Sequence, residues 1–124
     1  MGLSLLTRFV IFSKKQNLFN NFSVIILSVK LNILWLKNSI GITLEQEIQT
    51  NKRIALLPYY FWPRTDAWEQ IKLELEARAW ISVTERTNTL NNIANIINCW
   101  QNKTGNETLD ELQQKFEQVH IYKY

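Results

Sequence analysis

The chain has two prolines, and together they bracket a run of four aromatic residues, Tyr59 to Trp62. Proline cannot continue a helix, because it has no amide hydrogen and its ring clashes with the preceding turn. Pro63 also holds the residue before it, Trp62, in an extended conformation. The segment around Pro58 and Pro63 is therefore predicted to be extended. It separates a part of the chain with strand-like patterning from a part with helical patterning.

Before the prolines, the apolar residues alternate as they do in β-strands. Residues 23–36 are rich in β-branched side chains, and residues 40–48 repeat the pattern after a short turn, Lys37-Asn38-Ser39. Alternation of this kind predicts two strands joined as a hairpin, each with one buried face. The predicted buried residues are Val29, Leu31, Ile33, Trp35, Ile40, Ile42 and Leu44. A lone hairpin is marginally stable in water, so helices must cover it.

After the prolines, three capping-box spacings predict three helix starts, at Asp66, Ser82 and Thr108, each followed three residues later by a glutamate. The second helix is expected to end near Gln101, and the third to be short. Apolar stripes at helical spacing are expected on all three helices. They comprise Trp68, Ile71, Leu75 and Ala79, then Leu90, Ile93, Ala94, Ile97 and Trp100, then Leu109, Leu112, Phe116 and Val119.

These patterns predict an α+β fold, with a small antiparallel β-hairpin covered by two amphipathic helices and a short third helix near the C-terminus. A chain of 124 residues with 46% hydrophobic and 20% charged residues can bury one core. We expect three parts: a basic N-terminal extension over residues 1–22, a core domain over 23–101, and a C-terminal tail with the short helix over 102–124.

The charges are unevenly distributed along the chain. Residues 1–40 carry five basic residues and no acid, whereas the remainder carries nine basic and eleven acidic residues. A basic arm on a nearly neutral domain favours a polyanionic partner, most commonly nucleic acid, although solvated surface charge is the alternative. The candidate RNA-binding residues lie outside the predicted helices, in the arm and the loops. They are Arg8, Lys14, Lys15, Lys37, Lys52, Arg53 and Arg64.

The sequence offers little for catalysis. The sole histidine, His120, lies near the C-terminus, where a solvated role is expected. Cys99 lies near a predicted helix C-terminus, where the helix dipole does not favour a thiolate. The only aspartates, Asp66 and Asp110, lie at predicted helix starts. With no metal-ligand spacing and no glycine-rich phosphate loop, we expect no enzyme, no cofactor, no metal site and no small-molecule substrate.

The aromatic run has two interpretations. Trp68 and Trp100 are expected in the core, because each lies on an apolar helical stripe. The aromatic run itself could pack beneath the helices or face a partner, and Arg64 beside it could bind RNA or form a local salt bridge. The candidate protein-contact residues are Tyr59, Tyr60 and Trp62. No apolar run reaches the roughly 18 residues of a membrane span, so no membrane association is expected.

The string YYFWPRTDAWEQIKLELEARAWIS, followed by TLNNIANIINCWQ, resembles the plastid-specific ribosomal protein 3 family. The resemblance covers about residues 29–101. Its most specific motif is Tyr60 to Arg64 followed by Asp66 to Glu69. The family has cyanobacterial relatives, and the resemblance implies a non-catalytic structural constituent of the small (30S) subunit of the chloroplast ribosome. Such a protein would bind small-subunit ribosomal RNA and neighbouring ribosomal proteins in translation.

Two rival functions remain open at this point. One is a free RNA-binding translation factor that associates transiently with the ribosome, and the other is a peripheral membrane protein that uses its apolar, basic N-terminus. The composition favours residues with AT-rich codons, which are frequent in organelle genomes. The single cysteine excludes an intrachain disulfide and fits a reducing compartment. Together these features favour a plastid-encoded protein of the chloroplast stroma.

Overall fold

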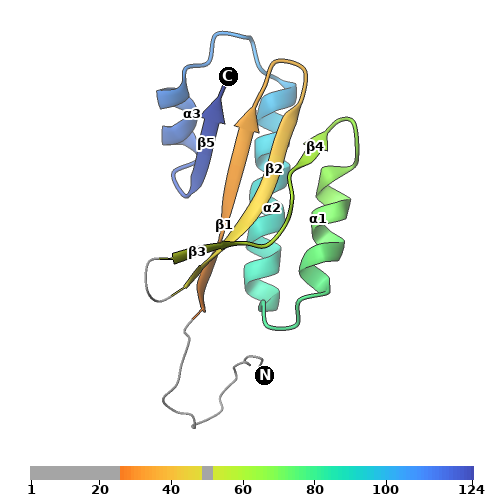
Figure 1. The fold of residues 1–124 in the computed structure, drawn as a ribbon. Coiled ribbons are helices and arrows are strands. Elements are labelled where there is room, and N and C mark those ends of the chain that lie inside the picture. Colours follow the sequence, from red (N-terminus) through yellow and green to blue (C-terminus); the bar gives the residue numbers. More distant parts are fainter. Residues whose placement is uncertain (1–25, 49–51) are drawn as a thin grey trace, which may run out of the picture.

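A computed structural model describes residues 26–48 and 52–124 (Figure 1). The predicted N-terminal extension, with Arg8, Lys14 and Lys15, lies outside these residues. In chain order the elements are β1 (Ile26–Trp35), β2 (Ile40–Ile48), β3 (Lys52–Ala55), β4 (Tyr60–Trp62), α1 (Ala67–Glu76), α2 (Val83–Gln101), α3 (Leu109–Lys115) and β5 (Val119–Lys123).

The predicted hairpin is the centre of the sheet. Strands β1 and β2 pair antiparallel, and Ile33 lies opposite Ile42. The flanking pairs Leu31–Leu44 and Trp35–Ile40 lie on the same face because side chains alternate along a strand. All six side chains are at most 5% exposed. The hydrophobic alternation of the sequence therefore identified the buried face of both strands, although Val29, which was also predicted to be buried, is half-buried.

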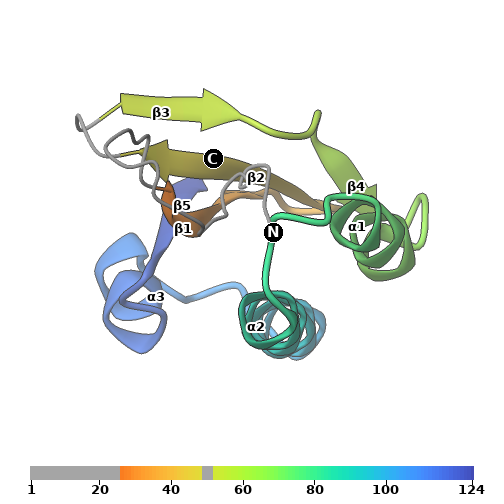
Figure 2. The same ribbon diagram turned by 90° about the horizontal axis from the view of Figure 1, so that it is seen from below.

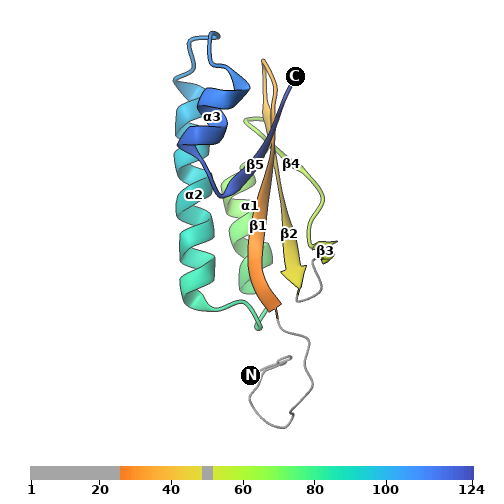
Figure 3. The same cartoon turned by 90° about the vertical axis from the view of Figure 1, so that its left-hand side faces the viewer.

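The sheet has five strands rather than the two of the predicted hairpin. The order is β3-β2-β1-β5, and β4 also pairs with β2. Helices α1, α2 and α3 all lie on one side of this sheet, and the opposite side carries no helix of the described chain (Figures 2 and 3). The predicted α+β class is confirmed, with a larger mixed sheet and with α3 as a third helix on the covered side.

The three predicted helix starts are confirmed by their capping contacts. The side chains of Asp66, Ser82 and Thr108 each accept a hydrogen bond from the backbone amide three residues later. At Thr108 the bond is reciprocal, because the Glu111 carboxylate accepts a hydrogen bond from the Thr108 amide at 3.0 Å. Each cap satisfies a donor that would otherwise lack a partner at the helix end.

The predicted stripe of α1 was wrong at its C-terminal end. The helix ends at Glu76, so Ala79 lies beyond it and is exposed. The buried residues of α1 are Ala67, Ile71 and Leu75. Trp68 is half-buried rather than fully buried, and its indole N–H donates to the carbonyl oxygen of Leu90 at 3.0 Å.

The predicted stripe of α2 was close to the observed one. Ile93, Ile97 and Trp100 are buried as expected, whereas Leu90 and Ala94 are half-buried. The full buried set is Thr89, Ile93, Ile96, Ile97 and Trp100. The indole N–H of Trp100 donates to the carbonyl oxygen of Leu36 at 2.8 Å, which ties the end of α2 to the end of β1.

The assignment of Val119 to the third helix was wrong. Helix α3 ends at Lys115, and Val119 begins strand β5, which pairs parallel to β1. Along β5, Val119 and Ile121 are buried, whereas the alternating residues His120 and Tyr122 are exposed. Val119 fits both a helical stripe and this two-residue alternation, and pairing with the available edge of β1 decides in favour of the strand.

Gln113 on α3 fixes the outer edge of β5. Its side-chain amide nitrogen donates to the carbonyl oxygens of Phe116 and Val119, and its oxygen accepts from the amide of Ile121 at 3.2 Å. Backbone groups on a sheet edge otherwise present a template for further pairing. A single amide side chain therefore satisfies part of the edge that β5 would expose.

The prediction of a loop through Lys52 and Arg53 was also wrong. Both residues belong to β3, which pairs antiparallel with the end of β2, with Arg53 opposite Glu47. All four residues of β3 are exposed. The strand therefore forms through backbone pairing and cross-strand charge rather than through apolar burial, and hydrophobic alternation could not reveal it.

Candidate nucleic-acid interface

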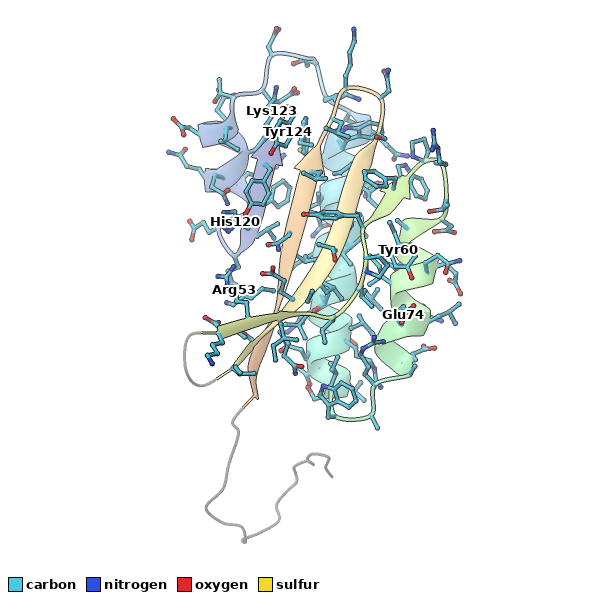
Figure 4. The ribbon with its side chains drawn as sticks, in the orientation of Figure 1. Arg53, Tyr60, Glu74, His120, Lys123 and Tyr124 are labelled. Carbon is cyan, nitrogen blue, oxygen red and sulfur yellow. The ribbon has the colours of Figure 1, made fainter. Side chains whose placement is uncertain are left out.

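Three exposed cations gather at one end of the sheet. Lys37 lies in the turn between β1 and β2, Arg64 follows β4, and Lys123 ends β5. The register explains their proximity, because Trp35 is paired with both Ile40 and Lys123, and Ile40 is paired with Trp62. Figure 1 shows the three chain segments at the same end of the sheet, and Figure 4 labels Lys123 there. We call Lys37, Arg64 and Lys123 the cationic end.

The cations of this end are not neutralised by acids within the described part of the chain. The four ion pairs found there involve Lys30, Arg53, Lys72 and Arg78, and none involves the cationic end. A fourth cation, Lys103, approaches from α2, but its ammonium nitrogen lies 3.6 Å from the centroid of the Trp100 ring. The cationic end therefore presents positive charge that remains available to an anion.

The predicted pair Lys52 and Arg53 lies at the other end of β2. Lys52 is paired with Ile48 and the cationic end lies beside Ile40, so the two sites are roughly 25 Å apart at about 3.3 Å per residue. The Arg53 guanidinium lies 3.5 Å from the Glu45 carboxylate. The structure thus brings Lys37 and Arg64 together but separates them from Lys52 and Arg53.

Aromatic side chains gather on the face of the sheet that no described helix covers. His120 and Tyr122 of β5 lie opposite Asn32 and Leu34 of β1, which alternate with the core residues of that strand. Asn32 is nevertheless buried and Leu34 half-buried, so this face is partly covered. The two rings are stacked, with centroids 4.8 Å apart and an interplanar angle of 12°. Both side chains are exposed, and Tyr122 is 40% exposed. Figure 4 shows His120 on this strand.

Two further aromatic rings belong to Phe61 in β4 and to Tyr59 directly before it. The rings of Tyr59 and Phe61 have centroids 6.2 Å apart. Phe61 is paired with Gly41, and a Cβ atom at Gly41 would lie only 2.7 Å from the Phe61 ring. Glycine is therefore required for this ring to lie over β2. We call Tyr59, Phe61, His120 and Tyr122 the aromatic strip.

The pKa of the Tyr59 hydroxyl depends on its burial and on nearby ionisable side chains. Burial raises the pKa of the Tyr59 hydroxyl, and the nearby Tyr122, Glu45 and Tyr124 raise it further. Tyr59 precedes β4 at one edge of the sheet, and Tyr122 lies on β5 at the other edge, yet the two hydroxyls are near enough for Tyr122 to affect the pKa of Tyr59. At pH 7 the Tyr59 hydroxyl is therefore neutral and available as a hydrogen-bond donor.

Tyr60 and Trp62 lie on the opposite face, toward the helices. The Tyr60 hydroxyl donates to Glu74 on α1 at 3.0 Å, and Figure 4 shows this pair. Glu74 also binds Arg78 at 2.9 Å, and hydrogen bonds from Arg78 and Tyr60 lower the pKa of the Glu74 carboxyl. Trp62 is half-buried, and its indole N–H has no acceptor among the residues described.

The remaining polar groups that could carry chemistry are a pocket beside Glu85 and the thiol of Cys99. A pocket of about 160 Å³ lies between β1 and α2, but its one carboxylate, Glu85, accepts a hydrogen bond from the Val29 amide at 2.8 Å. Cys99 is half-buried beside Lys115. No group of three or more metal-ligating side chains occurs in 26–48 and 52–124, and no helix there is long and apolar enough to cross a membrane.

The comparison with known proteins identifies the family. Residues 56–103 match the model of the plastid and cyanobacterial ribosomal protein family PSRP-3/Ycf65. The small ribosomal subunit protein cS23 of Gracilaria tenuistipitata is 45% identical over 89 residues, which cover 72% of this chain and 89% of that protein. This chain belongs to the PSRP-3/Ycf65 family.

Other members of the PSRP-3/Ycf65 family show the same level of similarity. A probable small ribosomal subunit protein cS23 of a Synechococcus strain is 44% identical, with 73% of this chain and 91% of the relative covered. The protein cS23z of Arabidopsis thaliana is 45% identical over 64% of this chain and 48% of its own length. The resemblance read from the aromatic motif is thereby confirmed.

Lys123, His120 and Tyr122 were not among the predicted contact residues. A signal was present, because Val119 and Ile121 alternate with His120 and Tyr122 over the last strand. That alternation is short, and it gains meaning only when β5 pairs with β1. The part of the chain matched by the PSRP-3/Ycf65 model ends at residue 103 and does not reach this strand.

Proposed function

We propose that this chain is a structural, non-catalytic constituent of the plastid small ribosomal subunit and that it binds the RNA of that subunit. Relatives that are 45% identical to this chain over the aligned residues are named small ribosomal subunit proteins. The observation that carries the RNA contact is the cationic end, where Lys37, Arg64 and Lys123 are exposed and form no ion pair with a described residue.

The proposed mechanism is neutralisation of phosphates by cations held on short, well-defined turns. Cations that replace condensed counterions on RNA contribute affinity that falls as salt rises. The sheet fixes the backbone positions of Lys37 and Arg64, while their exposed side chains can adjust to the phosphates. Lys52 at the far end of β2 would engage a second stretch of backbone, and Arg53 would contribute less because Glu45 already lies beside it. From the arm, Arg8, Lys14 and Lys15 would add contacts.

A neighbouring ribosomal protein is proposed to contact the outer edge of β4. This strand pairs with β2 on one side, and its residues Tyr60 and Trp62 are half-buried. Tyr59, the third predicted protein-contact residue, lies on the other face. The Phe61 carbonyl of this strand already accepts hydrogen bonds from Thr65, so the contact would be made by the aromatic rings, which are frequent in protein interfaces. The chain would act in the chloroplast stroma as a plastid-encoded protein.

A salt titration of binding to small-subunit RNA tests the RNA contact. The variant Lys37→Ala/Arg64→Ala should bind more weakly, and the slope of log affinity against log salt should become shallower by roughly 1.4–1.8, since each phosphate contact contributes about 0.7–0.9. The matched control is Lys72→Ala, whose ammonium already lies 3.4 Å from Glu76 in the parent. The control should leave the slope unchanged.

An unchanged slope in the double variant, with an unchanged melting temperature, would contradict the proposed contact. Washing isolated small subunits with high salt tests the structural role separately. A structural constituent remains with the subunit, whereas release into the wash at moderate salt would favour a transient translation factor.

A further inference from the structure

We propose that the aromatic strip is a stacking platform for unpaired RNA bases. The inference rests on the proposed binding of small-subunit RNA and deepens it, by assigning single-stranded nucleotides to the uncovered face of the sheet. The platform consists of His120 and Tyr122 on β5 together with Phe61 in β4 and Tyr59 directly before it. None of these four side chains was a predicted RNA contact.

The geometry of the rings suits stacking. His120 and Tyr122 already form a stacked pair with an interplanar angle of 12°, so a flat ring can continue the stack without a change of rotamer. Every base has a flat face of similar chemistry, and stacking on an aromatic side chain is tolerant of sequence. Tyr122 is 40% exposed, so its ring is accessible to a ligand.

The strands beneath the rings support them at the surface of the sheet. Phe61 lies over Gly41, where a side chain would collide with it. On the covered face of the same strands, Ile42 and Ile33 are fully buried beneath the helices. Burial on that side anchors the sheet, so the rings on the open side project from a rigid support rather than from a mobile loop.

The charges around the strip favour a nucleic acid over a protein surface. The acids on this face are each paired, Glu47 with Lys30 at 3.7 Å and Glu45 with Arg53 at 3.5 Å. The cationic end lies at the top of the same strands and has no such pairing among the described residues. A single strand could therefore stack its bases on the rings while its phosphates reach Lys37, Arg64 or Lys123.

Unpaired bases are the required chemistry, because a duplex conceals the faces of its bases. In an RNA duplex the bases are stacked on each other, and proteins contact mainly phosphates and ribose hydroxyls. The cationic end can bind either form, but the aromatic strip can bind only a strand whose bases are exposed. This difference separates the two contributions experimentally.

The test compares binding of the full chain to a fluorescently labelled oligouridine of about ten nucleotides and to an RNA duplex of the same length. The variant Tyr59→Leu/Tyr122→Leu should lose at least about tenfold in affinity for the single strand, given the usual contribution of a stacked base, and less than about twofold for the duplex. Tyr122→Phe keeps the ring and should bind the single strand as the parent does.

Trp80→Leu is the matched control for an exposed aromatic residue elsewhere, because Trp80 is 41% exposed and lies between α1 and α2. It should leave both affinities unchanged. Parent-like binding of the single strand by the double leucine variant would overturn the proposal, as would equal losses on single strand and duplex. Loss of assembly into the subunit without any loss of oligouridine binding would also overturn it and would assign the strip to a protein neighbour.

A measurement on the parent protein keeps the proposal testable if the double variant does not fold. Nuclear Overhauser effects between uridine base protons and the ring protons of Tyr122 or His120 are expected in the complex with oligouridine. Their absence in a saturated complex would overturn the platform. The salt slope of Lys37→Ala/Arg64→Ala reports separately on phosphate contacts, so failure of the platform and failure of the proposed function give different results.

Discussion

The two faces of the sheet use the same strands for different purposes. On the covered face, Ile33, Ile42 and Leu44 are fully buried beneath the helices. On the open face, the neighbouring positions carry the aromatic strip and paired charges. The contrast is sharpest on β5, where Ile121 is 3% exposed and the next residue, Tyr122, is 40% exposed. Apolar burial is therefore concentrated on one face among the described residues, and exposed aromatic and charged side chains lie on the other.

The largest expected effect is a loss of stability, and it compares the buried Trp100 with the exposed Trp80. Trp100→Ala should lower the free energy of unfolding by roughly 3–5 kcal/mol, because it removes a large buried ring and its hydrogen bond to Leu36. Trp80→Ala, at an exposed position, should cost less than about 1 kcal/mol. Urea denaturation followed by circular dichroism measures both, and equal losses would contradict the comparison.

A second prediction compares adjacent residues of β5. Ile121→Ala should lower the free energy of unfolding by about 2–4 kcal/mol, because its side chain lies in the core. Tyr122→Ala should cost less than about 1 kcal/mol while weakening single-stranded RNA binding. Should Ile121→Ala prove as mild as Tyr122→Ala, β5 would be a surface tail and not part of the core.

A smaller effect is expected from a change beneath the strip. Gly41→Ala places a methyl group against the Phe61 ring, so the ring or the strand must shift at a cost of about 1–2 kcal/mol. Thermal melting measures this loss. Gly41→Ala/Phe61→Leu removes the ring that collides and should recover part of the stability. If the double variant is no more stable than Gly41→Ala, the collision is not the cause.

The smallest effect concerns the hydrogen-bonded group of Tyr60, Glu74 and Arg78 between β4 and α1. Hydrogen bonds from Arg78 and Tyr60 lower the pKa of the Glu74 carboxyl in the folded protein. A lowered folded pKa stabilises the fold at pH values above the unfolded value, about 4.3 for glutamate, and this contribution is lost as the pH falls through the folded pKa. Glu74→Gln should therefore melt slightly below the parent at pH 7, and the difference should shrink in acid. If the difference in melting temperature between Glu74→Gln and the parent grew as the pH fell, the folded pKa of Glu74 would not be lowered.

The sequence predicted most of the covered face correctly because its signals are local. Alternation in β1 and β2 and the caps at Asp66, Ser82 and Thr108 each depend on residues close together in the chain. The strand β5 depends on pairing with β1, which lies far away in the sequence, and five residues are too few for alternation to outweigh a competing helical stripe. Strand β3 carries no buried residue, so it gave no apolar pattern.

The candidate site was less predictable than the fold for the same reason. Lys37 and Arg64 were predicted as candidates because each lies in a turn that local signals define. Their proximity, and that of Lys123, follows from the register of three strand pairs. The aromatic strip joins residues from β5 to residues beside β4, and no spacing in the sequence relates His120 to Tyr59.

The most direct test of the account is a cryo-electron microscopy map of the assembled plastid small subunit containing this protein. The open face of the sheet should lie against ribosomal RNA, with at least one unpaired base stacked on Tyr122, His120, Tyr59 or Phe61 and with phosphates near Lys37 or Arg64. An open face that points to solvent, with RNA contacts made instead by helices α1 and α2, would contradict the division of the sheet into a stabilising face and a binding face.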